Sequence, residues 1–390
     1  MERFQNDDKR LPNAAKTAAM PKQAQLRVLK RSDDAVNCVA WHPNQKTIAV
    51  GADDGRVTFY DVRKGEELRG SIQRTAAVST VAFAHDGSLA VGGADGLVAI
   101  HDKRGKLVRE IAAGEGVRSC AFAPKTCEVC VGGEGGVHLT YFDAEGKRRL
   151  PFPGRSLWVW SLAFSPDGCY LAVGGDDDSS IAIITTKTNE VTKEITREGP
   201  DNIINARSNG PFAKERDFAI ENHPAVRCLA YAPDGFSLAA GGLDSRVVVY
   251  YLPSATVRTT IKRQGAVWAV AYSSDGNCLA IGGADQRIGF YDVATGAPQR
   301  VVPALDEVRC LAFSPTYLAS GDASGMLVLH PVETEYSGPR DDAQLSKWEA
   351  AAASDDDDAS TASDDDDGVA LPPITSPPPK TGLAIIADKW

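Results

Sequence analysis

A short pattern that recurs about every 40 residues constrains the fold of this chain more than any other feature. Each copy begins with a valine and continues as an apolar run that leads into a turn, such as Ser-Pro-Asp-Gly at residues 165–168. Short apolar runs bounded by Gly, Pro and Asp are typical of β-strands joined by hairpins. Seven valines begin the copies, at intervals of 42, 39, 42, 67, 41 and 41 residues: Val36, Val78, Val117, Val159, Val226, Val267 and Val308.

The rest of each repeat follows one plan. A second strand ends in a Gly-rich turn, and a third ends near an aromatic residue or a histidine. A fourth strand follows six of the repeats, whereas the seventh runs into a polar segment. This period, with about four short strands per repeat, predicts an all-β fold, a seven-bladed β-propeller. We expect the strand-like run Leu26–Lys30 to pair with the last blade and so close the ring. We also expect the turn aspartates to bond backbone amides: Asp54, Asp95, Asp244 and Asp285.

The repeats resemble those of the WD40 family over roughly residues 26–332, which is most of the chain. The period, the run that ends in Ser-Pro-Asp-Gly and the Gly-Gly-x-Asp turn carry this resemblance. The repeats are divergent, since no Trp-Asp and no Gly-His dipeptide occurs. Other residues stand where the family has tryptophan: Tyr60, His101, Phe142 and Tyr291. We therefore expect the family's network of hydrogen bonds among Asp, His, Ser or Thr, and Trp to be missing or incomplete.

Charge is concentrated at the C-terminal end of the chain. Residues 331–390 hold 14 acidic and 4 basic side chains, which accounts for the whole net charge of −10. We predict three parts: a flexible N-terminal segment at 1–25, a propeller at 26–332 and a disordered, acidic and Pro-rich tail at 333–390. The balanced propeller has no basic surface for general phosphate binding, which argues against nucleic acid as the main ligand.

Targeting signals and cofactor motifs are not evident in the sequence. No apolar run reaches 18 residues and the charged N-terminus is unlike a secretory signal, so we predict an intracellular protein, cytoplasmic or nuclear, without a membrane partner. The eight cysteines are predicted to be free thiols in the core. Cys127 and Cys130 have CxxC spacing but no second pair, so no metal site and no cofactor is predicted.

The residues next to the seven valines form the candidate binding site. In propellers that resemble this one, these positions open onto the narrow top face around the central channel. Arg and Trp are enriched in interface hot spots, so we predict a site for partner proteins here. The alternative is that the Trp rings pack between blades and the Arg residues pair with nearby acids. The predicted partner-binding residues are Asn37, Arg118, Trp158, Trp160, Arg227, Trp268 and Arg309.

For two further segments, the sequence leaves two alternative roles open. The 67-residue interval contains an insertion at 197–224, which is either a tolerated surface loop or a partner-binding element. The tail ends in GLAIIADKW at 382–390, which is either a docking peptide or the start of a further element. Within the tail, Ser354 and Ser363 each precede four Asp and Ser376 precedes Pro, so these three are candidate phosphorylation sites.

We consider three functions, beginning with the one that these features favour most. The first is a non-catalytic WD40-like scaffold whose top face binds peptide segments of other proteins, with acidic or phosphorylated segments suited to the Arg residues. The second is a chaperone-like adaptor that binds histones or other basic proteins through the Asp-rich tail. The third is a propeller hydrolase or lactonase, which is disfavoured because the expected ring lacks inward acidic or metal-binding residues. We predict that the chain is not an enzyme.

Overall fold

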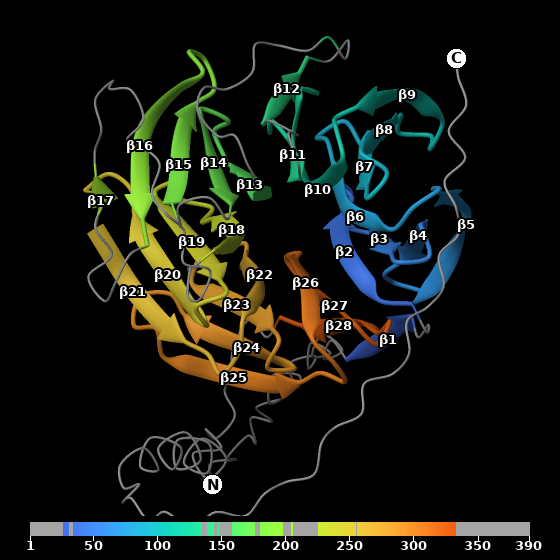
Figure 1. Ribbon diagram of the computed structural model, residues 1–390. Coiled ribbons are helices and arrows are strands. Elements are labelled where there is room, and N and C mark those ends of the chain that lie inside the picture. Colours follow the sequence, from blue (N-terminus) through green and yellow to red (C-terminus); the bar gives the residue numbers. More distant parts are fainter. Residues whose placement is uncertain are drawn as a thin grey trace, which may run out of the picture. The chain divides into compact units, whose positions relative to one another are not determined.

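Seven antiparallel β-sheets stand around a common centre in the computed structural model of the chain (Figure 1). The structure describes residues 26–30, 34–134, 139–143, 147, 158–175, 180–197, 204–205, 225–254 and 256–332. Each sheet is one blade, and the inner strand of each blade contacts the inner strand of the next, the last with the first. The predicted all-β, seven-bladed propeller is confirmed. In the described residues no helix is long and apolar enough to cross a membrane.

Four blades have four strands each, in chain order from the centre outward. Blade 1 contains β2 (Val36–Trp41), β3 (Thr47–Ala52), β4 (Arg56–Asp61) and β5 (Glu66–Gln73). Blade 2 contains β6 (Val78–Phe83), β7 (Leu89–Gly93), β8 (Leu97–His101) and β9 (Leu107–Ala112). Blade 5 contains β18 (Val226–Tyr231), β19 (Ser237–Gly242), β20 (Arg246–Tyr251) and β21 (Thr256–Lys262). Blade 6 contains β22 (Val267–Tyr272), β23 (Cys278–Gly283), β24 (Arg287–Asp292) and β25 (Pro298–Pro303).

The other three blades vary this plan. Blade 3 contains β10 (Gly116–Phe122), β11 (Val129–Glu134) and β12 (Thr140–Phe142), and the fourth strand expected at 149–152 lies outside the described residues. Blade 4 contains β13 (Val159–Phe164), β14 (Tyr170–Gly175), β15 (Ser180–Thr185), β16 (Glu190–Thr196) and β17 (Ile204–Asn205). Blade 7 contains β26 (Val308–Phe313), β27 (Tyr317–Asp322) and β28 (Leu327–Pro331), and β1 (Arg27–Lys30) pairs antiparallel with β28.

Burial falls from the middle of each blade to its rim. The second strand is almost wholly buried, as in β3, whereas the fourth strand β5 is exposed along nearly its whole length. A strand that is covered on both faces needs apolar residues at successive positions, which explains runs such as Ile48-Ala-Val50. The hydrophobic core therefore lies between neighbouring blades rather than at the channel.

A glycine–valine contact repeats at all seven junctions between blades. A Cβ atom added to Gly51 would lie 2.5 Å from Cγ1 of Val78, the first residue of the next blade. Glycine therefore serves here for close approach of two sheets rather than for backbone freedom. This contact explains why the repeating valine and the Gly-rich second strand recur together. The pairs are Gly51–Val78, Gly92–Val117, Gly132–Val159, Gly174–Val226, Gly241–Val267, Gly282–Val308 and Gly321–Val36.

Three of the four turn aspartates bond backbone amides as expected: Asp54, Asp95 and Asp244. Oδ1 of Asp54 accepts a hydrogen bond from the Arg56 amide at 2.8 Å, and Oδ1 of Asp95 accepts one from the Leu97 amide at 3.1 Å. Asp244 accepts a longer bond of 3.3 Å from the Arg246 amide. These bonds hold the turn between the second and third strands of a blade.

Arginine supplies a side-chain network that the sequence did not predict. At three junctions, an arginine directly follows the fourth strand of one blade. This arginine pairs with the turn aspartate of the next blade. In blade 6, Arg263 also donates to the hydroxyl of Tyr291 at 3.0 Å, and Tyr291 stands where the family has tryptophan. These arginine–aspartate pairs differ from the family's network among Asp, His, Ser or Thr, and Trp, which was expected to be missing or incomplete. The pairs are Arg74–Asp95 at 3.1 Å, Arg197–Asp244 at 2.9 Å and Arg263–Asp285 at 2.8 Å.

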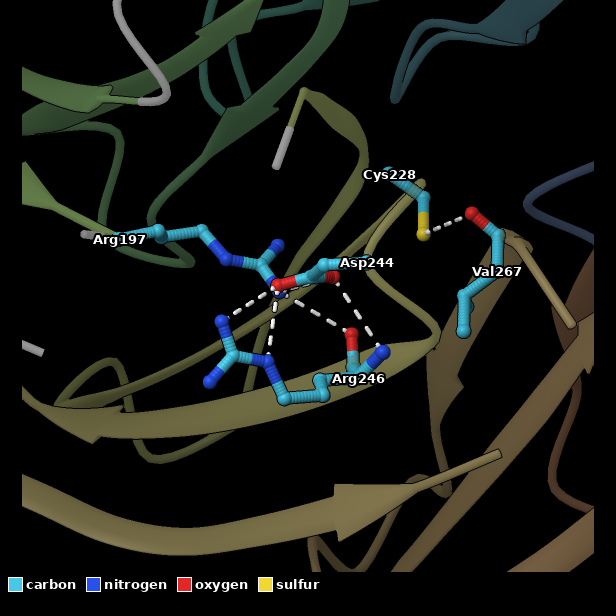
Figure 2. A network of polar contacts seen from close by, with 5 residues as sticks. All are labelled: Arg197, Cys228, Asp244, Arg246 and Val267. Carbon is cyan, nitrogen blue, oxygen red and sulfur yellow. Dashed lines mark hydrogen bonds and ion pairs between the residues drawn. The ribbon is translucent and has the colours of Figure 1, made fainter. Parts of the chain in front are cut away.

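Arg197 is the most deeply buried of these three arginines (Figure 2). Its side chain is 0% exposed, and its Nη2 donates to both carboxylate oxygens of Asp244 at 2.9 Å and to the Arg246 carbonyl at 3.1 Å. The side chain of Arg246 approaches the same carboxylate at 3.0 Å. Arg197 is also the first residue of the insertion at 197–224, so the start of that insertion is fixed inside the fold. Beyond it, the structure describes β17, which pairs with β16 at the outer edge of blade 4.

Candidate functional site

A β-bulge marks the same position in all seven inner strands. The pairing register shifts between the repeating valine and the residue two positions after it, for example between Val36 and Cys38. A bulge leaves one residue outside the ladder and changes the direction of its side chain. The bulged residues are the ones next to the repeating valines: Asn37, Ser79, Arg118, Trp160, Arg227, Trp268 and Arg309.

These bulged residues surround a cavity at the centre of the ring. The cavity has a volume of about 410 Å³, and we call it the mouth. Six of the seven predicted site residues line it. The seventh, Trp158, is not among the lining residues; the residue is 39% exposed, and the centroid of its ring lies 5.5 Å from that of Trp160. The lining residues are Asn37, Asp53, Ala77, Ser79, Ala94, Arg118, Trp160, Arg227, Trp268, Glu307 and Arg309.

An arginine–tryptophan cluster occupies the part of the mouth formed by blades 3 to 5. The Arg227 guanidinium lies 3.8 Å from the centroid of the Trp160 ring, and the Arg118 guanidinium lies 5.0 Å from it. Both distances are within the range of cation–π attraction. Because the two arginines come from the blades on either side of blade 4, the ring of Trp160 is flanked by both. The cluster holds two cations and one aromatic face in fixed positions.

A hydrogen-bonded polar group occupies the opposite part, formed by blades 7 and 1. Arg309 Nη1 donates to Asn37 Oδ1 at 2.7 Å and lies 3.4 Å from Asp53 Oδ2. Asn37 Nδ2 in turn donates to Asp53 Oδ1 at 2.7 Å. Arg309 is therefore oriented by two residues of blade 1.

Both interpretations of the ring are represented in the structure. Arg309 pairs with Asp53, and Arg118 pairs with Glu134 at the end of β11, as the packing alternative expected. The same side chains, together with Trp160 and Trp268, nevertheless line one cavity, as the binding interpretation expected. A role of these residues in binding stays a prediction.

The sequence reasoning missed Asp53 and Glu134 as parts of this region. Asp53 directly follows the second strand β3, and Glu134 is the last residue of the second strand β11, so each lies opposite the start of the inner strand of its own blade. Glu134 is the register partner of Gly116, and the Asp53 amide bonds the Ala35 carbonyl. An acidic residue at this turn position was visible in the sequence, but its closeness to the bulged residue follows only from the register.

None of the eight cysteines is among the residues that line the mouth. Cys38, Cys120, Cys130, Cys228 and Cys310 are buried free thiols, as predicted, whereas Cys169 is exposed, which corrects the core assignment for that residue. Cys169 follows the tight turn at Gly168, where the strand has not yet entered the core. Burial raises the pKa of Cys228 and of Cys310 to about 12, so both stay protonated at neutral pH. Within the described residues no group of three or more His, Cys, Asp or Glu could hold a metal ion.

Several predicted features lie outside the described residues. These are the candidate phosphorylation sites Ser354, Ser363 and Ser376, the segment 382–390 and most of the insertion at 197–224.

Comparison with known proteins gives matches to repeat families and to translation proteins. A family model described as "Anaphase-promoting complex subunit 4 WD40 domain" matches residues 25–85, and one described as "WD domain, G-beta repeat" matches residues 146–184, 216–250 and 255–292. The chain is 25% identical over 219 residues to eukaryotic translation initiation factor 3 subunit I of Drosophila grimshawi, covering 56% of this chain and 51% of that protein. It is 31% identical over 155 residues to small ribosomal subunit protein RACK1y of Oryza sativa subsp. japonica, covering 36% and 45%. The chain therefore spans about half the length of these relatives.

Proposed function

The chain belongs to the WD40-repeat family, and we propose that it acts as a non-catalytic scaffold that binds a peptide segment of a partner protein at the mouth. The observation that carries this proposal is the bulge repeated in seven strands, which directs Arg and Trp side chains into one cavity of about 410 Å³. A rigid ring of this kind presents large, oriented side chains at a low entropic cost of binding.

The chemistry of the mouth suits a peptide that carries an acceptor group. Arg118, Arg227 and Arg309 are held in place by an aromatic ring or by polar neighbours, so little motion is lost when they bind. An acidic or phosphorylated side chain is the natural partner for such guanidinium groups. We propose this class of segment as the ligand.

The relatives support a role within a larger assembly. By their names, one is a subunit of a translation initiation factor and the other a protein of the small ribosomal subunit. We propose that this chain likewise works inside the cell as one protein among several in a complex.

The acidic C-terminal segment suggests a second way of binding. Residues 331–390 have a net charge of −10, which would attract histones or other basic proteins through a salt-dependent interaction. A protein that ends at residue 332 would lose this interaction and keep binding at the mouth, so the two modes can be separated.

Replacing Arg227 and Arg309 with alanine tests binding at the mouth. Each substitution removes a charged hydrogen-bond donor from the mouth. Together they are expected to reduce the recovery of a partner about 10- to 100-fold in affinity purification from cells. The matched control is Arg104→Ala, which removes an exposed arginine from the turn between β8 and β9, at the opposite end of a blade. Equal recovery with the double variant and with Arg104→Ala, at matched thermal stability, would count against this site.

A further inference from the structure

The charges that line the mouth are separated between its two sides. Two of the three arginines, Arg118 and Arg227, belong to blades 3 and 5. Both acidic lining residues, Asp53 and Glu307, belong to blades 1 and 7. The third arginine, Arg309, lies on the side of the carboxylates and pairs with Asp53, whereas Arg118 pairs with Glu134 outside the lining. A ligand that spans the mouth therefore meets Arg118 and Arg227 on one side and the Glu307 carboxylate on the other.

The two acidic residues differ in what they already bind. Asp53 accepts from Asn37 and lies near the Arg309 guanidinium, so its charge is compensated. Glu307 immediately precedes β26, and among the described residues it makes no ion pair. Its backbone is fixed, because its amide bonds Oδ1 of Asp306 at 2.8 Å and its carbonyl accepts from the Ala323 amide at 2.9 Å. Glu307 is thus a half-buried carboxylate on a fixed support at the edge of the cavity.

Covering such a carboxylate with a ligand that carries no positive charge is unfavourable. A charge that loses water without gaining a partner is strongly destabilised. A uniformly acidic segment would suit Arg118 and Arg227 but would meet repulsion at Glu307. A uniformly basic segment would pair with Glu307 but would be repelled by Arg118 and Arg227. The arrangement therefore discriminates against both kinds of uniformly charged ligand.

We propose that the mouth recognises a peptide segment with an acidic and a basic side chain, both of which contact the cavity. The acidic side chain pairs with Arg227 and Arg118 next to the Trp160 ring, and the lysine or arginine pairs with Glu307. This inference rests on the proposed function, since it specifies the ligand of the same site.

Selection from a random peptide library displayed on phage tests the inference with the full-length chain. We expect the selected peptides to be enriched about tenfold, relative to the starting library, in sequences that contain both an acidic and a basic residue. Glu307→Gln keeps the shape of the side chain and removes its charge, so enrichment of the basic residue should disappear while that of the acidic residue remains. Arg227→Gln should have the opposite effect.

The outcomes separate this inference from the proposed function. Selection of acidic peptides that depends on Arg227 but is unchanged by Glu307→Gln would overturn the inference and leave the mouth as a peptide site. Selection of peptides that is unchanged by both variants and by Trp160→Ala, or no selection above a blank support, would contradict the proposed function itself. Thermal unfolding of each variant shows whether a change in selection reflects binding or loss of the fold.

Discussion

Asp244→Ala is expected to lower the free energy of unfolding of the propeller by about 3–5 kcal/mol. Asp244 is the only carboxylate bonded to Arg197 among the described residues, and the Arg197 side chain is 0% exposed. The substitution leaves a buried guanidinium without a counter-charge. A loss of this size lowers the melting temperature by on the order of 10 °C, which is measurable by calorimetry or circular dichroism.

Two variants make this prediction specific. Glu67→Ala removes a carboxylate that lies 3.8 Å from Arg56 on the surface, where both side chains are nearly half exposed. We expect it to change stability by about 1 kcal/mol or less. Adding Arg197→Met to Asp244→Ala removes the uncompensated charge and should recover part of the lost stability. Equal melting temperatures for Asp244→Ala and Glu67→Ala would show that the buried pair does not hold blade 5.

Gly321→Ala is expected to destabilise the junction between blade 7 and blade 1. The added methyl group would overlap the side chain of Val36 and lie 2.7 Å from Sγ of Cys310. Both neighbours are buried between two sheets, so neither can move away freely. Overpacking of this kind costs about 1–3 kcal/mol, measured as a shift in the denaturant midpoint.

The neighbouring valine provides the test of this mechanism. Val36→Ala removes the methyl groups that meet the new Cβ atom, so Gly321→Ala together with Val36→Ala should lose less stability than the sum of the two single losses. Gly116→Ala is the control, because its nearest neighbour would be an oxygen of Glu134 at 3.5 Å, an ordinary contact. Strict additivity of the two losses would argue against contact between the blades as the cause.

The fold was largely predictable because the repeats are regular. The valine spacing predicted seven blades, and the Gly-rich turns predicted where each second strand ends. Each of the same valines contacts a glycine in the second strand of the preceding blade, as Val78 contacts Gly51. One period therefore encodes both the strands and the packing between blades, which is why the sequence alone was informative here.

The arginine network was not predictable from the same period. Arg74 and Arg263 precede the next repeating valine by four residues, whereas Arg197 precedes it by 29. The common feature is the end of the fourth strand, and strand ends are poorly defined in a single sequence. Asp53 in the lining of the mouth was missed for a related reason, since its closeness to the bulged residues depends on register between strands.

The most direct test of binding at the mouth is site-specific photo-crosslinking in cells. A photoreactive p-benzoylphenylalanine in place of Ser79 lies in the mouth, whereas one in place of Lys103 lies on an exposed turn at the opposite end of the same blade. If the mouth binds a partner segment, mass spectrometry will find one partner peptide crosslinked to position 79 and none to position 103. A partner crosslinked to position 103 and never to position 79 would contradict the account.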